Sequence, residues 1–184
     1  MKEIIKTLND HGVGIYDEKR SSFIACSAPI SSEEEAFNFI KDMKGWHKKA
    51  DHYVYAYTVY DEENALISRY SDDREPQGTA GQPILGVFQS QNIENAAIVV
   101  ARYYGGTPLG AAGLTRAYRK VAGIAVHESG IIHKVLYDEL FITMDYSMYN
   151  NVNYMLHSNT RADLMSLKYK IIQEEFGEKI RIHM

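Results

Sequence analysis

Three carboxylates within four residues make one segment the first candidate for chemistry. It runs Asp72-Asp73-Arg74-Glu75-Pro76-Gln77-Gly78-Thr79-Ala80-Gly81. Carboxylates this close together can hold a hard cation or divide the roles of acid and base. They can also form a solvated turn in which the acids cap the following helix, Arg74 pairs with them and Thr79 is a plain N-cap. The spacing by itself favours the turn.

A second segment places four glycines between a predicted strand and a predicted helix. It runs Arg102-Tyr103-Tyr104-Gly105-Gly106-Thr107-Pro108-Leu109-Gly110-Ala111-Ala112-Gly113. Glycines let backbone amides approach a ligand, and the helix dipole favours negative charge, so the segment is a natural anion site. The Gly-Lys-Ser/Thr ending of a P-loop is absent, as is the G-x-G-x-x-G order, so nucleotide hydrolysis is not predicted. The glycines can also serve only to turn the chain tightly, and both interpretations stay open.

Basic and aromatic residues gather in two further places. The sequence has Lys44, Trp46, His47, Lys48 and Lys49 in one run, and Arg116, Arg119 and Lys120 on the helix predicted after the glycines. Aromatic rings beside cations can stack on bases while the charges meet phosphate. The alternative is two solvated helix faces, which is the simpler interpretation unless the clusters meet in space.

The histidines and the cysteine give no sign of a metal site. His52 alternates with Val54 and Ala56 on a predicted strand, which indicates a core histidine. None of the seven histidines has the H-E-x-x-H or a comparable spacing, so we predict no metal and no cofactor. The single Cys26 lies in an apolar run and is interpreted as a buried thiol. One cysteine excludes an intramolecular disulfide and fits a reducing compartment, so we expect a cytoplasmic protein.

The elements that position these residues follow from hydrophobic periodicity. A capping box, Ser32-Glu33-Glu34-Glu35, predicts a helix over 32–44. Further predictions are strands at 22–28, 52–60, 65–70 and 96–101, a short helix near 84–88 and a helix over 114–128. Beyond residue 137 the pattern predicts a strand, a helix at 149–158 and a hairpin in 169–184, a β-α-β-β unit. We therefore expect an α+β protein with domains 1–136 and 137–184.

Composition narrows the class of partner. The chain has 184 residues and a net charge of −4, and neither half is basic, so an RNA contact would need a local patch. The N-terminus does not resemble a signal peptide, and the longest apolar run, 96–101, is too short to cross a bilayer. We expect no membrane association.

Three segments together resemble the signature of the IMPACT/YigZ family. They are Ala50-Asp51-His52-Tyr53-x-Tyr55-Ala56-Tyr57, the acidic segment extended to Ser71 and Ile84, and the glycine segment extended to Tyr118. The resemblance implies a first domain with the left-handed β-α-β fold of a ribosomal small-subunit protein and of elongation factor domain IV. It implies a ferredoxin-like second domain, here shortened to β-α-β-β. Eukaryotic members are translational regulators, and bacterial members are supposed to bind nucleic acid or ribosomes.

The chain departs from the family pattern in three ways. Arg74 stands where the family has a glycine, and Ala112 replaces a glycine of the second segment. The extra cation weakens a metal interpretation of the acidic segment. The shortened second domain lacks a helix and a strand, which leaves a sheet edge that must be covered or paired, and a homodimer through this edge is one way to do so.

Three functions are consistent with these features. The first is a non-catalytic protein that binds RNA, the ribosome or a translation-associated protein. The second is an enzyme that acts on a phosphorylated small molecule, with the acidic and glycine segments bordering one cleft. The third is a protein–protein adaptor. The first function names no catalytic residue and takes as anion or nucleic-acid contacts Lys48, Lys49, Arg102, Tyr103, Gly105, Gly106, Gly110, Gly113 and Arg116, with a family-motif set of His52, Asp72, Asp73, Glu75, Gly78, Thr79 and Gly81.

Overall fold

The computed structural model describes residues 4–135, 140–157 and 171–183. The chain divides into two compact units, Met1–Leu136 and Tyr137–Met184. Both combine helices and strands, so the protein is α+β. That these units are the two predicted domains, 1–136 and 137–184, stays a prediction.

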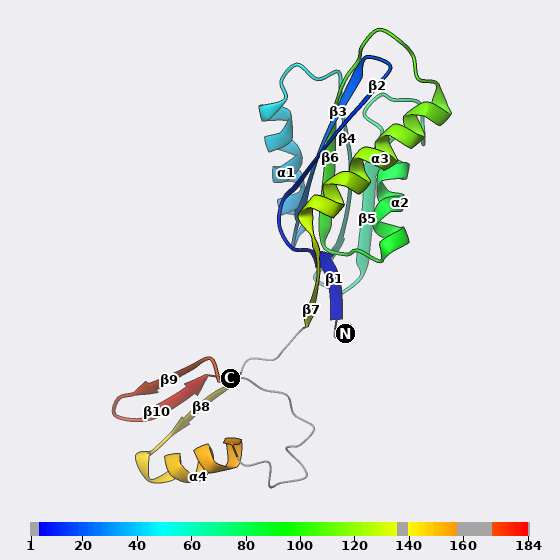
Figure 1. The fold of residues 1–184 in the computed structure, drawn as a ribbon. Helices are drawn as coiled ribbons and strands as arrows, with labels where there is room; N and C mark the ends of the chain where they lie inside the picture. The colour runs from blue at the N-terminus through cyan, green and yellow to red at the C-terminus, as the bar shows by residue number, and fades with distance from the viewer. Residues whose placement is uncertain (1–3, 136–139, 158–170, 184) are drawn as a thin grey trace. The chain divides into compact units, whose positions relative to one another are not determined.

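A five-stranded antiparallel sheet organises the first unit (Figure 1). Its strands, in spatial order, are β2 (Gly12–Glu18), β3 (Ser21–Pro29), β6 (Ala96–Tyr103), β4 (His52–Tyr60) and β5 (Leu66–Ser71). Because β3 and β4 are both antiparallel to β6, they are parallel to each other, and with the helix between them they form a split β-α-β unit. The left hand of that crossover stays a prediction.

Helices cover both faces of this sheet. Helix α1 (Glu33–Trp46) lies on one face, and α2 (Gly81–Gln91) and α3 (Ala111–Ser129) lie on the other (Figure 1). Strand β6 contributes alternate residues to the two cores: Ile98 and Val100 toward α2 and α3, and Val99 and Ala101 toward α1. The prediction that 96–101 is a buried strand is confirmed, because its side chains are covered on both sides.

The helices begin where local hydrogen bonds allow. The Ser32 hydroxyl accepts the amide of Glu35, as the capping box predicted, but the Glu35 carboxylate accepts from the amide and hydroxyl of Ser31 rather than from Ser32. These bonds hold the pKa of Glu35 below its usual value. The prediction that Thr79 caps the next helix is wrong, because the N-cap position is Ala80 and the Thr79 hydroxyl donates to the Pro76 carbonyl.

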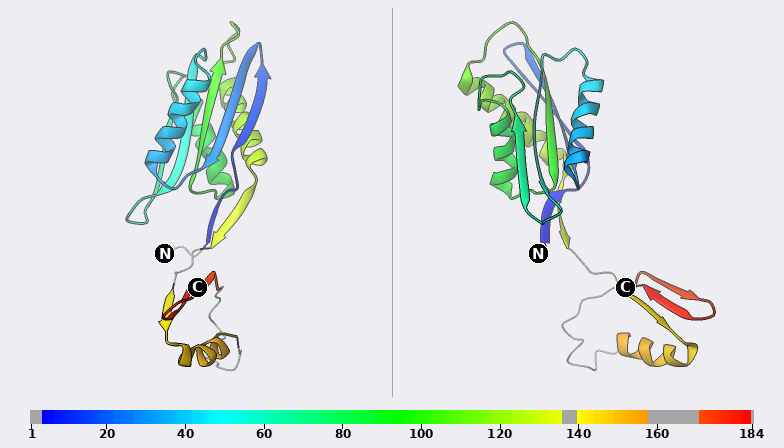
Figure 2. Two further views of the ribbon diagram at one scale, coloured as in Figure 1. Left: turned by 90° about the vertical axis from the view of Figure 1, so that its left-hand side faces the viewer. Right: turned by 180° about the vertical axis from the view of Figure 1, so that it is seen from behind.

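Strands β1 (Ile4–Leu8) and β7 (Ile131–Val135) pair antiparallel as a separate two-stranded sheet at the lower end of the main sheet (Figure 2). Together with β2, they are the strands that the sequence analysis did not identify. Within the described residues, no helix is long and apolar enough to cross a membrane.

The second unit is a β-α-β-β arrangement. A three-stranded antiparallel sheet of order β8-β10-β9 accompanies one helix. The elements are β8 (Phe141–Met144), α4 (Tyr146–His157), β9 (Gln173–Phe176) and β10 (Ile180–His183). Its buried apolar side chains among the described residues are Met144, Ile180 and Ile182. The ferredoxin-like assignment and the homodimer through the sheet edge stay predictions.

Candidate functional site

Four segments of the first unit meet at one end of the sheet. Strand pairing aligns Ser22 with Tyr103, His52 with Arg102, and Tyr55 with Ser71. The turn at 19–20, the segment 47–51, the loop 72–80 and the loop 104–111 therefore come together, at the upper end of this unit in Figure 1. We call these four segments the loop end.

Direct contacts tie the four segments to one another. The Asp51 carboxylate accepts the Tyr104 amide at 2.7 Å, and Arg74 Nη2 donates to the Asp51 carbonyl at 3.0 Å. Gly105 lies so close to the backbone of Arg20 that a Cβ at this position would overlap the Arg20 carbonyl. The loop end is thus one packed structure, and Gly105 is required by that close approach.

The acidic segment is occupied by backbone contacts. Asp72 accepts the amides of Gly78, Ala80 and Gly81 at 2.8, 3.0 and 2.8 Å, which caps α2. Asp73 accepts the Tyr53 amide at 2.6 Å, and its exposed neighbour Arg74 pairs with it at 3.8 Å. The interpretation of a turn whose acids cap the next helix is confirmed for Asp72, and so is the pairing of Arg74. No group of three or more His, Cys, Asp or Glu side chains suited to a metal occurs among the described residues.

Glu75 belongs to a different environment, a buried ionic cluster. Its Oε1 accepts Arg102 Nη1 at 2.5 Å and the Tyr118 hydroxyl at 2.7 Å. Burial, and then the Glu75 charge, raise the pKa of Tyr118 above its usual value, so this hydroxyl stays a donor. The Arg102 guanidinium lies 5.4 Å from the centre of the Phe23 ring and 5.3 Å from that of Tyr104.

Arg102 is 4% exposed, yet its donors are only partly used. A guanidinium has five N–H donors. Beyond the bond to Glu75, Nη2 has one long contact of 3.5 Å to the Ser21 hydroxyl, and Nε has no hydrogen-bond partner. Arg102 was predicted as an anion contact, and the structure places it inside the unit, already paired with a carboxylate. It is therefore no surface cation.

The glycine segment ends in an uncapped helix. Gly110, with φ of 75°, is the N-cap of α3 and makes no side-chain capping bond. The Leu114 amide donates to the carbonyl of the N-cap residue Gly110. The amides of Ala111, Ala112 and Gly113 therefore have no partner in the helix, as in any first turn. The positive φ of Gly106 shows that a second glycine serves the turn itself.

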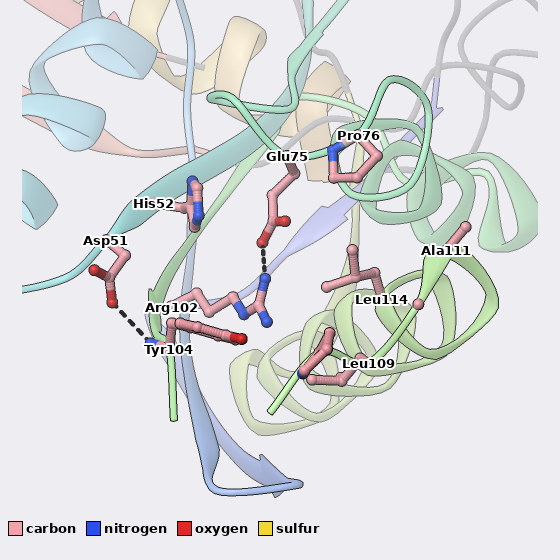
Figure 3. A pocket seen from close by; sticks show the side chains of 11 residues that line it. Asp51, His52, Glu75, Pro76, Arg102, Tyr104, Leu109, Ala111 and Leu114 are labelled. Carbon is pink, nitrogen blue, oxygen red and sulfur yellow. Dashed lines mark hydrogen bonds and ion pairs between the residues drawn. The ribbon is translucent and has the colours of Figure 1, made fainter. Parts of the chain in front are cut away.

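A pocket of about 390 Å³ joins the acidic and glycine segments (Figure 3). Its walls are Asp51, His52, Glu75, Pro76, Arg102, Tyr104, Pro108, Leu109, Gly110, Ala111 and Leu114. Residues of the acidic segment and residues of the glycine segment thus border one hollow, which is the arrangement that the enzyme hypothesis required. His52 does not contribute to a dry core: it is half-buried, lines this pocket and contacts the Asp73 carbonyl through Nδ1 at 2.8 Å.

The remaining predicted residues do not gather at one place. The Tyr103 hydroxyl meets His47 Nδ1 at 2.9 Å, and Lys48 and Lys49 are exposed beside them, after α1. Arg116 is exposed on α3, which covers the other face of the sheet. Cys26 is half-buried, and burial raises the pKa of its thiol.

Two exposed cations of the loop end were missed. Lys19 and Arg20 form the turn between β2 and β3, both with positive φ. Because β2 was not recognised in the sequence, this turn was not recognised either. Two adjacent basic residues before the strand predicted at 22–28 were the available signal.

Comparison with known proteins identifies the family. The Impact N-terminal domain model matches residues 19–126. The chain is 36% identical over 143 residues to IMPACT family member YvyE of Bacillus subtilis, covering 78% of this chain and 64% of that protein. It is 30% identical over 138 residues to IMPACT family member YigZ of Escherichia coli, covering 75% and 68%. The match thus spans less than two thirds of the length of YvyE.

One solved structure is similar over the whole chain. A protein described as hypothetical has a TM-score of 0.70 and 24% identity, and the match covers 100% of this chain and 85% of that one. This similarity concerns the fold alone. The signature segments, the matched domain and the sequence relatives agree, and the chain belongs to the IMPACT family.

Proposed function

We propose that this chain is a non-catalytic binding protein of translational regulation that contacts RNA, the ribosome or a translation-associated protein through its loop end. The observation that carries this proposal is the gathering of exposed cations there: Lys19, Arg20, Lys48, Lys49 and Arg74, which we call the rim. Membership of the IMPACT family favours translational regulation as the setting.

The balance of charge at the loop end supports an anionic partner. Lys19, Arg20, Lys48 and Lys49 form no ion pair within the described part of the chain, whereas the acids nearby accept internal hydrogen bonds. Asp72 is bonded to three amides, Glu75 to Arg102 and Tyr118, and Asp51 to the Tyr104 amide. The rim cations are therefore the charges left to meet a phosphate backbone.

The same internal bonds support a binding role over a catalytic one. A general base needs a carboxylate that can approach substrate. Asp72 and Asp73 hold the backbone of the loop, which is a structural use of both side chains. The enzyme alternative keeps one observation in its favour, because the acidic and glycine segments border one pocket. Incubation of the chain with sugar phosphates and Mg-ATP, followed by mass spectrometry, tests it: only a product of altered mass supports an enzyme.

Ribosome and RNA co-sedimentation over a range of salt concentrations tests the binding proposal. We expect the Lys48→Glu/Lys49→Glu variant to bind about tenfold or more weakly at low salt and to depend less steeply on salt, because two phosphate contacts become repulsive. A matched reversal away from the loop end, Lys41→Glu/Lys134→Glu, is expected to bind as the wild type does. The proposal fails if the wild type does not sediment with ribosomes or RNA at low salt, or if the two variants behave alike.

A further inference from the structure

We infer that the pocket at the loop end binds a small phosphate ester that carries hydroxyl groups, such as a sugar phosphate or the sugar-phosphate part of a mononucleotide. This site goes beyond the rim contacts proposed above, because it is an interior pocket rather than an exposed row of cations. The inference depends on three features of the pocket lining: donors with bonding capacity left, acceptors without partners, and apolar side chains.

The donors are the amides in the first turn of α3 and the guanidinium of Arg102 on β6. The amides of Ala111, Ala112 and Gly113 lie at the positive end of a 19-residue helix, and the Gly110 N-cap makes no side-chain capping bond. Arg102 supplies the second observation, since it lines the same pocket while 4% exposed, and its Nη2 is held only by the 3.5 Å contact to Ser21. The remaining guanidinium donors of Arg102 and the amides at the start of α3 are of the kind that bind the oxygens of a phosphate group.

The acceptors are His52, Glu75 and Asp51, which line the same pocket (Figure 3). His52 Nδ1 contacts a carbonyl oxygen, which can only accept, so Nδ1 carries a proton, and in the tautomer protonated there alone Nε2 is an acceptor. Glu75 uses Oε1 for both of its internal bonds, and its Oε2 has no hydrogen-bond partner among the described residues. Asp51 likewise uses only Oδ2, toward the Tyr104 amide.

These acceptors decide the class of ligand. Two carboxylates face one guanidinium in the pocket, so a bare phosphate dianion would meet repulsion that the helix dipole and Arg102 offset only in part. A ligand whose hydroxyls donate to Glu75, His52 and Asp51 removes that conflict while its phosphate accepts from α3. Pro76, Pro108, Leu109 and Leu114 give the walls an apolar surface for the carbon skeleton.

Calorimetric titration of the full chain with ribose 5-phosphate, inorganic phosphate and ribose tests the inference. We expect ribose 5-phosphate to bind more tightly than either fragment. Ala111→Pro is the sharp variant: proline is tolerated at the first helical position, so the helix is kept while one donor to phosphate is lost. We expect it to weaken ribose 5-phosphate binding about tenfold, the loss of one charge-assisted hydrogen bond. Ala111→Pro is expected to unfold at the same urea concentration as the wild type, which would show that the helix is kept.

The outcomes separate this site from the rim. If ribose 5-phosphate does not bind at millimolar concentrations, binds no more tightly than inorganic phosphate, or binds Ala111→Pro as tightly as the wild type, the inference is wrong. The Lys48→Glu/Lys49→Glu variant is expected to retain ribose 5-phosphate binding while it loses RNA or ribosomes. A wild-type chain that binds ribose 5-phosphate but sediments with neither RNA nor ribosomes would count against the rim alone.

Discussion

The two units of this chain bury apolar side chains to very different degrees. In the first unit both faces of the sheet are covered by helices, and the side chains of β6 are buried on each side. In the second unit three apolar side chains are buried among the described residues, and no residue of α4 is buried. A small unit excludes proportionately less surface from water, so it has less stability to lose.

That difference decides which unit can hold charge inside. Burying a guanidinium and a carboxylate costs free energy that their attraction offsets only with good geometry and further hydrogen bonds. The first unit supplies those conditions to Arg102 and Glu75 through Tyr118 and the ring of Phe23. The candidate site therefore lies in the unit with the larger core. Substitutions that damage each core in turn test this difference between the units.

The largest expected effect is from Arg102→Ala, which leaves Glu75 buried without its cation. We expect the free energy of unfolding of the first unit to fall by about 3–5 kcal/mol. Urea unfolding followed by hydrogen exchange in peptides from β6 and α3 measures it. The control Arg119→Ala, an exposed residue of α3, is expected to change stability by less than about 0.5 kcal/mol. Equal stability of the two variants would show that the ionic cluster does not stabilise this unit.

Ile180→Ala tests the other side of the comparison. Truncation of a fully buried side chain costs about 2–4 kcal/mol. The second unit has so few buried groups that we expect its amides to lose protection from exchange, while those of the first unit stay protected. The matched change Ile98→Ala costs a similar amount but is expected to leave the first unit folded. Joint loss of protection in both units after Ile180→Ala would show that they fold as one body.

Tyr118→Phe is expected to have a smaller effect, about 1–2 kcal/mol, because Glu75 keeps Arg102 and loses one hydroxyl. The variant should also change the response to alkali. The folded pKa of Tyr118 is raised, so the wild type loses stability as the pH rises past about 10, the ordinary pKa of tyrosine. Stability measured between neutral and alkaline pH should fall less steeply in Tyr118→Phe. An unchanged slope would contradict the assignment of this hydroxyl as a buried donor.

The smallest effect is expected at Arg74, whose φ of 71° lies in the region that favours glycine. Arg74→Gly removes that strain and loses one exposed hydrogen bond, so we expect a gain of about 0.5 kcal/mol. Arg74→Ala keeps the strain and loses the same bond, so it should be less stable than the wild type by a similar amount. Chemical denaturation of the three proteins side by side is the measurement, and identical midpoints would show that the backbone angle is of no consequence here.

Elements with a strong local pattern were predictable. The helix after Ser32, the buried strand 96–101 and the helix of 114–128 were all placed correctly, because periodicity and capping act within a few residues. Strands β1 and β7 were not identified. Their pairing joins Leu8 to Ile131, residues far apart in the chain. Neither strand has a side-chain pattern from which its partner could be predicted.

The candidate site also has features that the sequence predicts and features that it does not. Residue types and their order were enough to place this chain in the IMPACT family and to single out the acidic and glycine segments. They could not say that Asp72 would cap a helix while Glu75, three residues later, would turn inward to Arg102. Nor could they bring Arg20 and Lys48 to the same end of one sheet.

Helix caps and hydrophobic periodicity depend on neighbouring residues, so the sequence by itself determines them. The partner of a buried charge depends on strand register and helix packing, which only the tertiary structure determines. Arg102 shows the consequence most plainly. In the sequence it is a cation beside a glycine-rich loop. In the fold it is a buried side chain that lines the pocket bordered by the acidic and glycine segments. Only the pairing of β6 with β3 and β4 decides which of these it is, since that pairing sets what surrounds its guanidinium.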